Sequence, residues 1–269
     1  MLSFHLRLLA AQATTQFMGR PLVYAPRLAS TKALAARSAD LGWSEGLVVL
    51  AEEQTAGRGR QGRTWWAPAG QALLLSLLLR PGLSSHRSFE IMMLASLAAA
   101  EAIESVCAAP VALKWPNDLY IRGRKVGGIL IETQLSLTGI EVERAIIGIG
   151  INVAVDFTDQ PSLAESATSL HLEASQAPER EALLWSLLDR CEAHYEAVLA
   201  GHSCHAPWAG RLLWVGERVE VVTAEAPLAG VMRGVDEMGA LLIERPDGRL
   251  ETIWAGDVSL RRGHHSAHC

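Results

Sequence analysis

Runs of apolar residues along the chain predict an alternation of helices and strands. Segment 72–79 is almost continuously apolar, which predicts a strand buried on both faces. Segment 178–199 carries its apolar residues on one helical stripe, which predicts an amphipathic helix. A further helix is predicted over 31–41, where Ser30 or Thr31 can cap the start and Gly42 suits the end. The remaining predicted elements are a helix over 88–106 and strands over 17–24, 47–51, 111–115, 118–121, 125–133 and 145–153.

The pattern changes after about residue 212 to short strands separated by glycine turns. The clearest strands are predicted over 218–223, 228–235, 240–244 and 250–254. Five short strands in about 50 residues predict a small β-barrel, with a boundary near His205. We therefore expect an α/β domain over 1–205, whose core begins at about residue 17. A barrel over 206–269 with a disordered His-rich tail would follow it.

Composition and charge exclude several classes of protein. The 269 residues suffice for one or two domains. The formal net charge of −5 argues against a generally basic nucleic-acid binder. Four cysteines without a CxxC spacing indicate free thiols and a reducing compartment, so we expect a cytoplasmic protein. No apolar run is long enough to span a bilayer.

The first residues also fit a targeting segment. No acidic residue precedes Asp40, whereas several arginines do, which is typical of a mitochondrial transit peptide. Residues 1–16 could form such a segment. We favour a folded domain that begins with the strand predicted at 17–24.

A loop after the second predicted strand alternates three glycines with three arginines. Glycine lets the backbone approach a ligand closely, and arginine is a forked donor for carboxylate and phosphate. The spacing of Gly57, Gly59 and Gly62 fits a dinucleotide fingerprint, and the residues up to Arg63 approach a P-loop. Both motifs require a helix directly behind them, and segment 65–70 cannot begin one. The loop therefore predicts closure over an anionic ligand, with a solvated basic turn as the alternative.

Two further constellations carry polar residues at strand ends. Asn117 and Asp118 lie between two short strands, where they are either ordinary turn residues or contacts for a nucleotide and Mg²⁺. Lys125 begins a strand with paired glycines, where it either faces solvent or a ligand. Segment 148–153 interrupts an apolar strand with two glycines, which marks close approach by a ligand or by another backbone. Asn152 at its end is either a turn residue or a contact for adenine or ribose.

These segments together resemble the biotin–protein ligase family. The matching pieces are EEQTAGRGRQGRTW, KWPNDL, RKVGGILIE and GIGINV, in the order of the family. The resemblance implies an α/β (α+β) fold: a mixed, largely antiparallel sheet with flanking helices, as in class II synthetases and biotin–lipoate ligases. A small SH3-like C-terminal barrel would follow it.

The resemblance also implies a two-step reaction. Biotin would attack the α-phosphate of ATP to give biotinyl-5′-AMP, and a lysine of a biotin carboxyl carrier protein would then take the biotin. ATP and Mg²⁺ are the implied cofactors. Lys125, Arg58 and Arg60 would be catalytic, and Asp118 would lie near magnesium. The implied biotin-binding residues are Ser30, Thr31, Lys32, Gln54, Gly57, Arg58, Gly59, Arg60, Lys125, Gly127, Gly148 and Gly150. The implied nucleotide-binding residues are Arg60, Arg63, Trp65, Lys114, Asn117 and Asn152.

The sequence departs from the family at two positions. Lys32 stands where the family usually has asparagine, so a solvent-facing lysine is the alternative to a biotin contact. Gln61 stands where an arginine is common, which removes one positive charge from the loop.

Other functions remain open from the sequence. One alternative is a lipoate– or octanoate–protein ligase of the same superfamily, and another is a non-catalytic biotin-binding sensor. About 16 residues precede the first predicted strand, too few for a winged helix, so we expect a monofunctional ligase without DNA binding or a membrane partner. The strand at 128–132 could pair with a second subunit in a homodimer, and a monomer is equally compatible.

Overall fold

The computed structural model describes residues 14–174, 178–222, 227–254 and 259–262. Most of the candidate targeting segment and the His-rich tail lie outside these residues. Within them, no helix is both long and apolar enough to cross a membrane.

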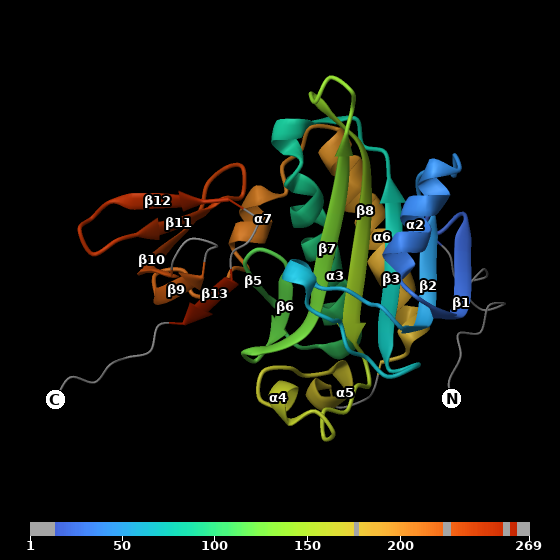
Figure 1. The fold of residues 1–269 in the computed structure, drawn as a ribbon, viewed down its shortest axis with the longest axis horizontal. Coiled ribbons are helices and arrows are strands. Elements are labelled where there is room, and N and C mark those ends of the chain that lie inside the picture. The colour runs from blue at the N-terminus through green and yellow to red at the C-terminus, as the bar shows by residue number, and fades with distance from the viewer. Residues whose placement is uncertain (1–13, 175–177, 223–226, 255–258, 263–269) are drawn as a thin grey trace.

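One eight-stranded sheet forms the larger part of the molecule. Its strands run in the order β1-β2-β3-β8-β7-β6-β5, with β4 paired to β8 (Figure 1). Only β1 and β2 pair in parallel, which confirms the expectation of a mixed, largely antiparallel sheet. The strands are β1 (Leu22–Leu28), β2 (Val48–Gln54), β3 (Ala72–Leu79), β4 (Leu83–Ser84), β5 (Ala112–Lys114), β6 (Asp118–Ile121), β7 (Arg124–Leu135) and β8 (Glu141–Asn152).

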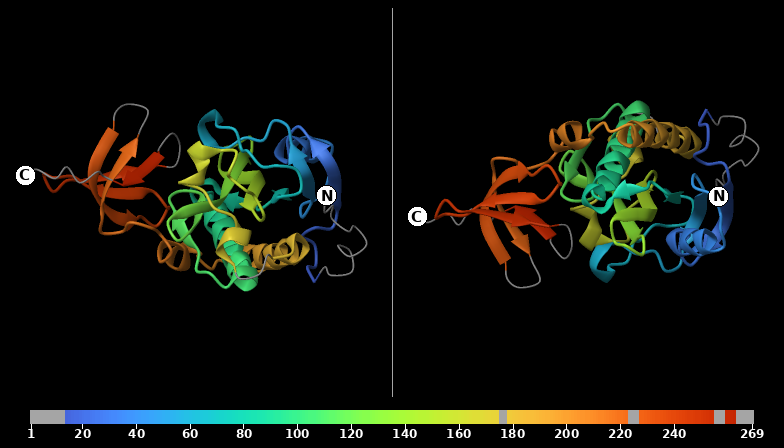
Figure 2. Two further views of the ribbon diagram at one scale, coloured as in Figure 1. Left: turned by 90° about the horizontal axis from the view of Figure 1, so that it is seen from below. Right: turned by 90° about the horizontal axis from the view of Figure 1, so that it is seen from above.

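Helices cover both faces of this sheet (Figure 2). Helix α2 (Thr31–Asp40) packs on one face, and α3 (Glu90–Cys107) and α6 (Arg180–Leu199) pack on the other. Strand β3 is buried along its whole length, because Leu77 faces α3 and α6 while Leu78 faces α2. The prediction of a strand buried on both faces is therefore confirmed. Short helices not predicted from the sequence are η1 (Arg60–Gly62), η2 (Ser85–Arg87), α4 (Pro161–Ala164), α5 (Leu170–Glu173) and α7 (His205–Ala209).

The expected ends of α2 are confirmed. The Ser30 side chain accepts a hydrogen bond from the amide of Ala33, so it caps the helix. Gly42 follows with a φ of 85°, a left-handed conformation that glycine adopts without strain. The capping serine is thereby fixed at the position where it also faces the cavity described below.

The strand predicted at 17–24 is wrong in its first half. Gly19 has a φ of 80°, and the amide of Arg20 donates to the Phe17 carbonyl, so these residues form a turn. The carboxylate of Glu192 in α6 accepts from the amides of residues 16–18, which holds the turn against that helix. Strand β1 begins only after Pro21, because proline has no N–H to donate to a ladder.

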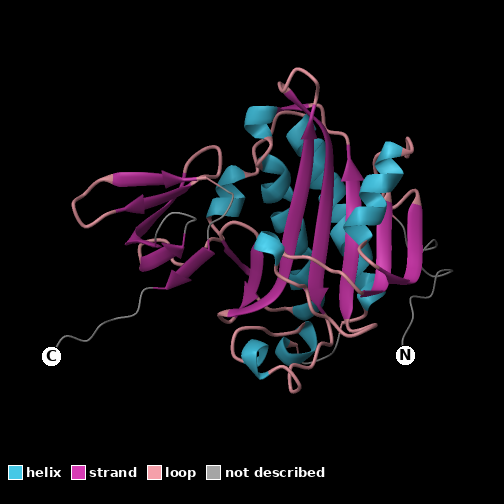
Figure 3. Cartoon of the chain, in the orientation of Figure 1, coloured by secondary structure: helices cyan, strands magenta, loops and turns pink. Residues whose placement is uncertain are grey.

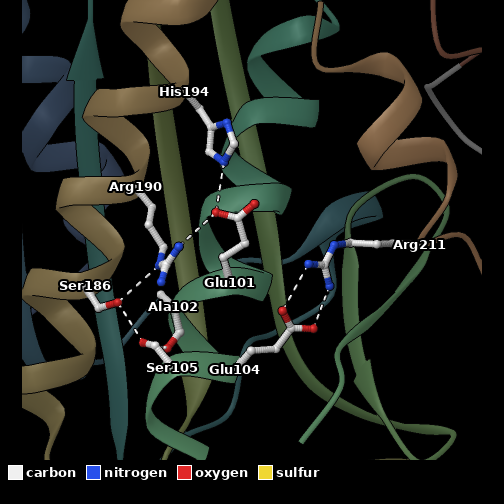
Figure 4. Close-up of polar contacts among 8 residues, drawn as sticks. All are labelled: Glu101, Ala102, Glu104, Ser105, Ser186, Arg190, His194 and Arg211. Atoms are coloured by element: carbon white, nitrogen blue, oxygen red, sulfur yellow. Dashed lines mark hydrogen bonds and ion pairs between the residues drawn. The ribbon is translucent and has the colours of Figure 1, made fainter. Parts of the chain in front are cut away.

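A polar cluster joins α3, α6 and the segment after α7 (Figure 4). Arg190 and His194 of α6 both contact the carboxylate of Glu101 in α3, at 3.1 Å. Arg211 makes two hydrogen bonds to Glu104, of 2.6 and 3.0 Å. Burial acts to raise the pKa of Glu104, but the hydrogen bonds from Arg211 and from the Val111 amide outweigh it and lower that pKa. The segment that leads to the second sheet is thereby tied to α3.

The second sheet is small and antiparallel, in the order β12-β11-β10-β9-β13. Its strands are β9 (Arg218–Val222), β10 (Pro227–Val235), β11 (Leu241–Glu244), β12 (Leu250–Ile253) and β13 (Ser259–Arg262). Five strands are therefore confirmed. Within the residues that the structure describes, β12 and β13 stand at the two ends of this path.

The second sheet projects from one side of the larger domain, next to β5 and α7 (Figure 3). The indole N–H of Trp115 donates to the carbonyl of Gly239 at 2.9 Å, across the two parts. Leu113 of β5 pairs with Leu212, just before the second sheet begins. The expected division after residue 205 falls at the start of α7. Trp208 of α7 packs against Phe89, the residue before α3, so α7 contacts the larger domain. The boundary therefore stays a proposal.

Candidate active site

A cavity of about 1090 Å³ opens on the sheet face that carries α2. Residues of β3, β7 and β8 form its floor. The loop after β2 crosses in front of these strands (Figure 1) and also lines the cavity. All but two of the site residues expected from the sequence line it. They are Ser30, Thr31, Lys32, Gln54, Arg58, Gly59, Arg60, Arg63, Trp65, Lys114, Asn117, Asp118, Lys125, Gly148, Gly150 and Asn152.

The two exceptions are Gly57 and Gly127. The loop after β2 that carries Arg58, Arg60 and Arg63 is called the arginine loop below. Gly57 lies at its base, where the Gly57 carbonyl accepts a hydrogen bond from the Trp65 amide at 3.0 Å. Gly127 faces the core, since a β-carbon there would lie 2.9 Å from the Leu119 side chain. Its neighbour Gly128 lines the cavity in its place.

A β-bulge explains why the neighbouring glycine is the one that faces the cavity. Strict alternation would put Lys125 and Gly127 on the same face of β7. Leu119 pairs with Gly127 but Tyr120 pairs with Lys125, so one residue of β7 is inserted at this point. The inserted residue shifts the alternation, which brings Lys125 and Gly128 to the same side.

One end of the cavity is built from neutral hydrogen-bonding groups. The side-chain oxygen of Gln54 accepts from the amide of Thr31 at 2.8 Å and lies 3.1 Å from its hydroxyl. The Thr31 hydroxyl also lies 2.8 Å from that of Ser76, which is fully buried in β3. These bonds join α2, β2 and β3, so the polar groups at this end are held rigidly before any ligand binds.

Lys32 forms the side wall of this neutral end. Its ammonium lies 2.5 Å from the Glu132 carboxylate of β7, and 14% of its side chain is exposed. The alternative of a solvent-facing Lys32 is therefore wrong. A β-carbon on Gly148 would lie 3.7 Å from both the Lys32 and Ser76 side chains, which puts Gly148 at this end.

The arginine loop folds back on itself as a tight turn. The Gly59 amide donates to the Arg63 carbonyl at 2.7 Å, and Arg58 bridges to Thr64. Gln61 at the tip has a φ of 56°, a left-handed conformation. Arg60 donates to the side chain of Asn117 at 3.4 Å, so the loop already reaches across the cavity to the turn between β5 and β6.

The middle of the cavity holds Lys125 and its partners. The Lys125 ammonium lies 2.6 Å from the Asp118 carboxylate and 5.7 Å from the centre of the Trp65 ring. Both contacts hold the ammonium in place, through an ion pair and through attraction to the ring face. Asn117 is fixed by its side-chain amide, which donates to the Ile129 carbonyl at 2.7 Å.

Trp65 lies directly on the glycines of β7 and β8. A β-carbon on Gly150 would be 2.7 Å from its ring, and one on Gly128 would be 3.3 Å away. Glycine is required at Gly150 for this close approach. The Trp65 indole N–H is buried without a hydrogen-bond partner among the described residues, which leaves a donor for a ligand.

The other end of the cavity lies at the end of β8. Asn152 is 4% exposed, and its amide donates to the Thr168 carbonyl at 3.0 Å. The ring centres of Trp66 and Phe157 lie 6.2 Å apart, and both side chains form an apolar part of the cavity wall here. The hydrogen bond to Thr168 fixes the orientation of the Asn152 side chain. The side-chain oxygen of Asn152 is then available to a ligand.

The cavity is strongly positive although the chain is acidic. Six cations and two carboxylates line it, whereas the net charge of the chain is −5. All three lysines of the sequence, Lys32, Lys114 and Lys125, lie in this lining. Burial and the neighbouring Asp118 raise the pKa of Tyr120 to about 12, so this hydroxyl keeps its proton at pH 7. Such a lining favours an anionic ligand.

Among the lining residues that were not expected from the sequence, three take part in the contacts described above: Ser76, Gly128 and Glu132. Ser76 carries a usable signal, since it is the polar residue in an otherwise apolar buried strand. Gly128 depends on the bulge, and Glu132 depends on the pairing of β7 with its neighbours. Neither feature can be read from the local sequence.

Two family models match separate parts of this chain. The model of the biotin/lipoate A/B protein ligase family matches residues 24–152, and that of the biotin protein ligase C-terminal domain matches 215–261. A biotin–[acetyl-CoA-carboxylase] ligase of Paracoccus denitrificans is 37% identical over 241 residues, which cover 86% of this chain and 97% of that protein. The chain belongs to the biotin protein ligase family.

Two further proteins are similar to this chain over most of its length. The bifunctional ligase/repressor BirA of Bacillus subtilis is 34% identical over 253 residues, which cover 91% of this chain and 76% of that protein. The structure of the biotin protein ligase from Aquifex aeolicus in complex with biotin and ATP aligns with a TM-score of 0.77 and 30% identity. That alignment covers 90% of this chain and 99% of the other.

Proposed function

We propose that this chain activates biotin with ATP to biotinyl-5′-AMP and then transfers biotin to a lysine of a biotin carboxyl carrier domain. The observation that carries the proposal is one cavity that joins a neutral polar end to a cluster of cations along a single strand. Gly148, Gly150 and Asn152 of β8 mark its neutral end, its middle and its far end. Strand spacing separates the first from the last by about 13 Å, which suits a ligand made of an acid and a nucleotide.

In this proposal the neutral end takes the biotin ring. The ureido group of biotin is neutral and has both donors and an acceptor, which complements the polar groups of Thr31, Gln54 and Ser76. The carboxylate of biotin would then reach the middle of the cavity. The adenine would lie toward Asn152, Trp66 and Phe157.

Lys125 and Arg58 would act on the charge that develops in the first step. Negative charge builds on the biotin carboxylate and the α-phosphate, and fixed cations stabilise it best where water is excluded. The Lys125 ammonium is held by Asp118 in this structure. An anionic ligand would therefore displace that carboxylate from the ammonium or share the ammonium with it. Arg60 would close the loop over the adenylate, and Arg63 and Lys114 would hold phosphate oxygens.

Magnesium fits this site only as part of the ATP complex. The described residues contain no group of three or more side chains able to ligate a metal, and Asp118 is the acidic lining residue beside Lys125. Mg²⁺ is commonly held by one or two carboxylates together with substrate phosphates. Asp118 is thus the residue that would reach the ion, which would shield the phosphate charge.

The partner and setting follow from the same proposal. The acceptor would be the lysine of a biotin carboxyl carrier domain of a carboxylase. A cytoplasmic location and pairing of two subunits through the sheet edge remain predictions.

Pyrophosphate release without a carrier tests the first step. The chain is supplied with ATP and Mg²⁺ and with biotin, lipoate or octanoate in turn. Release with biotin alone is the expected result. Release with lipoate or octanoate would move the protein to the sister ligases. Binding of biotin without release would favour a biotin-binding sensor.

A further inference from the structure

A buried carboxylate outside the cavity is connected to Lys125 through a closed ring of contacts. The segment between β8 and α6 passes below the ends of β7 and β8 and carries α4 and α5 (Figure 1). Ser166 and Ala167 of this segment line the cavity. The segment is therefore both a wall of the cavity and a support for the strands that carry the site.

The segment meets the backbone of Lys125 in a single isolated bridge. The Lys125 amide donates to the Ser166 carbonyl at 2.9 Å, and the Thr168 amide donates to the Lys125 carbonyl at 2.8 Å. Thr168 also accepts from the side chain of Asn152 through its own carbonyl at 3.0 Å. One buried residue thus holds both Lys125 of β7 and Asn152 of β8.

Glu173 closes the ring. Its carboxylate accepts from the Thr168 hydroxyl at 2.7 Å, from Arg124 at 2.7 Å and from Arg122 at 3.2 Å. The side chain of Glu173 is completely buried, whereas those of the two arginines are 39% and 70% exposed. Arg124 immediately precedes Lys125, so the ring runs from Lys125 through Thr168 and Glu173 back to the neighbouring residue.

This arrangement is suited to fixing a position. A bridge of two hydrogen bonds is weak by itself, because no neighbouring ladder supports it. A buried carboxylate is costly unless it is paired and hydrogen-bonded, so all three donors must stay in place around Glu173. The position of the Lys125 backbone and the orientation of Asn152 therefore depend on this carboxylate.

We propose that Thr168 and Glu173 are positioning residues for the adenylation step, which set Lys125 and Asn152 at the reacting phosphate and the nucleotide. The inference rests on the proposed function, since it assigns roles within that reaction. It separates the two ends of the cavity, because the ring touches the nucleotide end and the middle but not Thr31, Gln54 or Ser76.

The test compares kinetic constants of biotin-dependent pyrophosphate release. Thr168→Val keeps the volume and removes the hydroxyl that Glu173 accepts. We expect kcat to fall about tenfold and the KM for ATP to rise about threefold, with the KM for biotin unchanged. Thr168→Ser, which restores the hydroxyl, should return both constants to within about twofold of the original protein.

A matched control removes the same kind of hydrogen bond elsewhere. Tyr195 in α6 donates to the Glu45 carboxylate at 2.8 Å, away from the cavity. Tyr195→Phe should leave all three constants unchanged. An equal fall of kcat in Tyr195→Phe and Thr168→Val would overturn the proposal, because general destabilisation would then explain both.

A second variant covers the case in which Thr168→Val does not fold. Arg124→Gln acts on the half-exposed side of the ring, where a substitution is tolerated more readily. It should lower kcat about threefold with the same pattern of KM values. Unchanged kcat in a folded Thr168→Val or Arg124→Gln variant, or an equal rise of the KM for biotin, would also overturn the proposal. If the original protein itself releases no pyrophosphate with biotin, the proposed function fails instead.

Discussion

The two halves of the cavity recognise ligands by different physical means. At the neutral end, Thr31, Gln54 and Ser76 satisfy one another through hydrogen bonds and are largely buried. In the middle, Lys125 is paired with a carboxylate and lies against an aromatic ring, in a more open setting. Neutral, rigid groups suit selection of a substrate, whereas fixed charges suit a reaction in which charge develops.

This difference predicts that substitutions in the two halves separate binding from catalysis. An interaction present equally in the ground state and the transition state changes KM, and one that strengthens in the transition state changes kcat. Variants at the charged half should therefore act on kcat, and variants at the neutral half on the KM for biotin. The following variants test that separation, from the largest expected effect to the smallest.

Lys125→Ala should lower the rate of adenylate formation about a thousandfold, because it removes a fixed cation from the site where charge develops. The measurement is single-turnover pyrophosphate release at saturating biotin and ATP. Arg37→Ala removes an exposed cation from α2 and serves as the control for net charge. A rate for Lys125→Ala within tenfold of the original would remove Lys125 from the catalytic role.

Arg60→Gly should release the adenylate about 10- to 100-fold faster, since a charge-assisted hydrogen bond is lost. The measurement is the transfer of biotin to an added free amine. All three lysines of the chain line the cavity, so the exposed surface offers no competing lysine. If the amine gains no biotin from Arg60→Gly while pyrophosphate is still released, the closing role of the loop is wrong.

Gln54→Leu should raise the KM for biotin about tenfold and leave kcat within about twofold, because the buried Thr31 groups lose their acceptor. Gln134→Leu, on the exposed end of β7, is the matched control. A fall of kcat as large as that of Lys125→Ala would break the separation of the two halves.

Lys32→Asn should change the KM for biotin by no more than about threefold, because the amide keeps a donor and the lost pair with Glu132 is partly exposed. Lys32→Leu, which keeps no donor, should raise that KM further. Equal KM values for the two variants would mean that Lys32 makes no polar contact with biotin.

The pattern of apolar residues was enough to predict the main elements. Strand β3 and strand β6 coincide with the predicted segments 72–79 and 118–121, because continuous apolar runs and turn residues are local signals. The failure at 17–24 has a local cause as well, since Gly19 and Pro21 both interrupt a strand. Its second cause is distant, because Glu192 holds the turn from another helix.

The sequence by itself determined the family, the approximate positions of the strands and a set of site residues of which all but Gly57 and Gly127 line the cavity, because these depend on motifs and on local periodicity. Only the tertiary structure decided that Gly128 rather than Gly127 faces the cavity, because a bulge in strand pairing shifts the alternation of β7. It also decided that Lys32 pairs with Glu132, and that Thr168 and Glu173 support Lys125. Those contacts join residues far apart in the chain, and their register is fixed by packing of the whole sheet rather than by neighbouring residues.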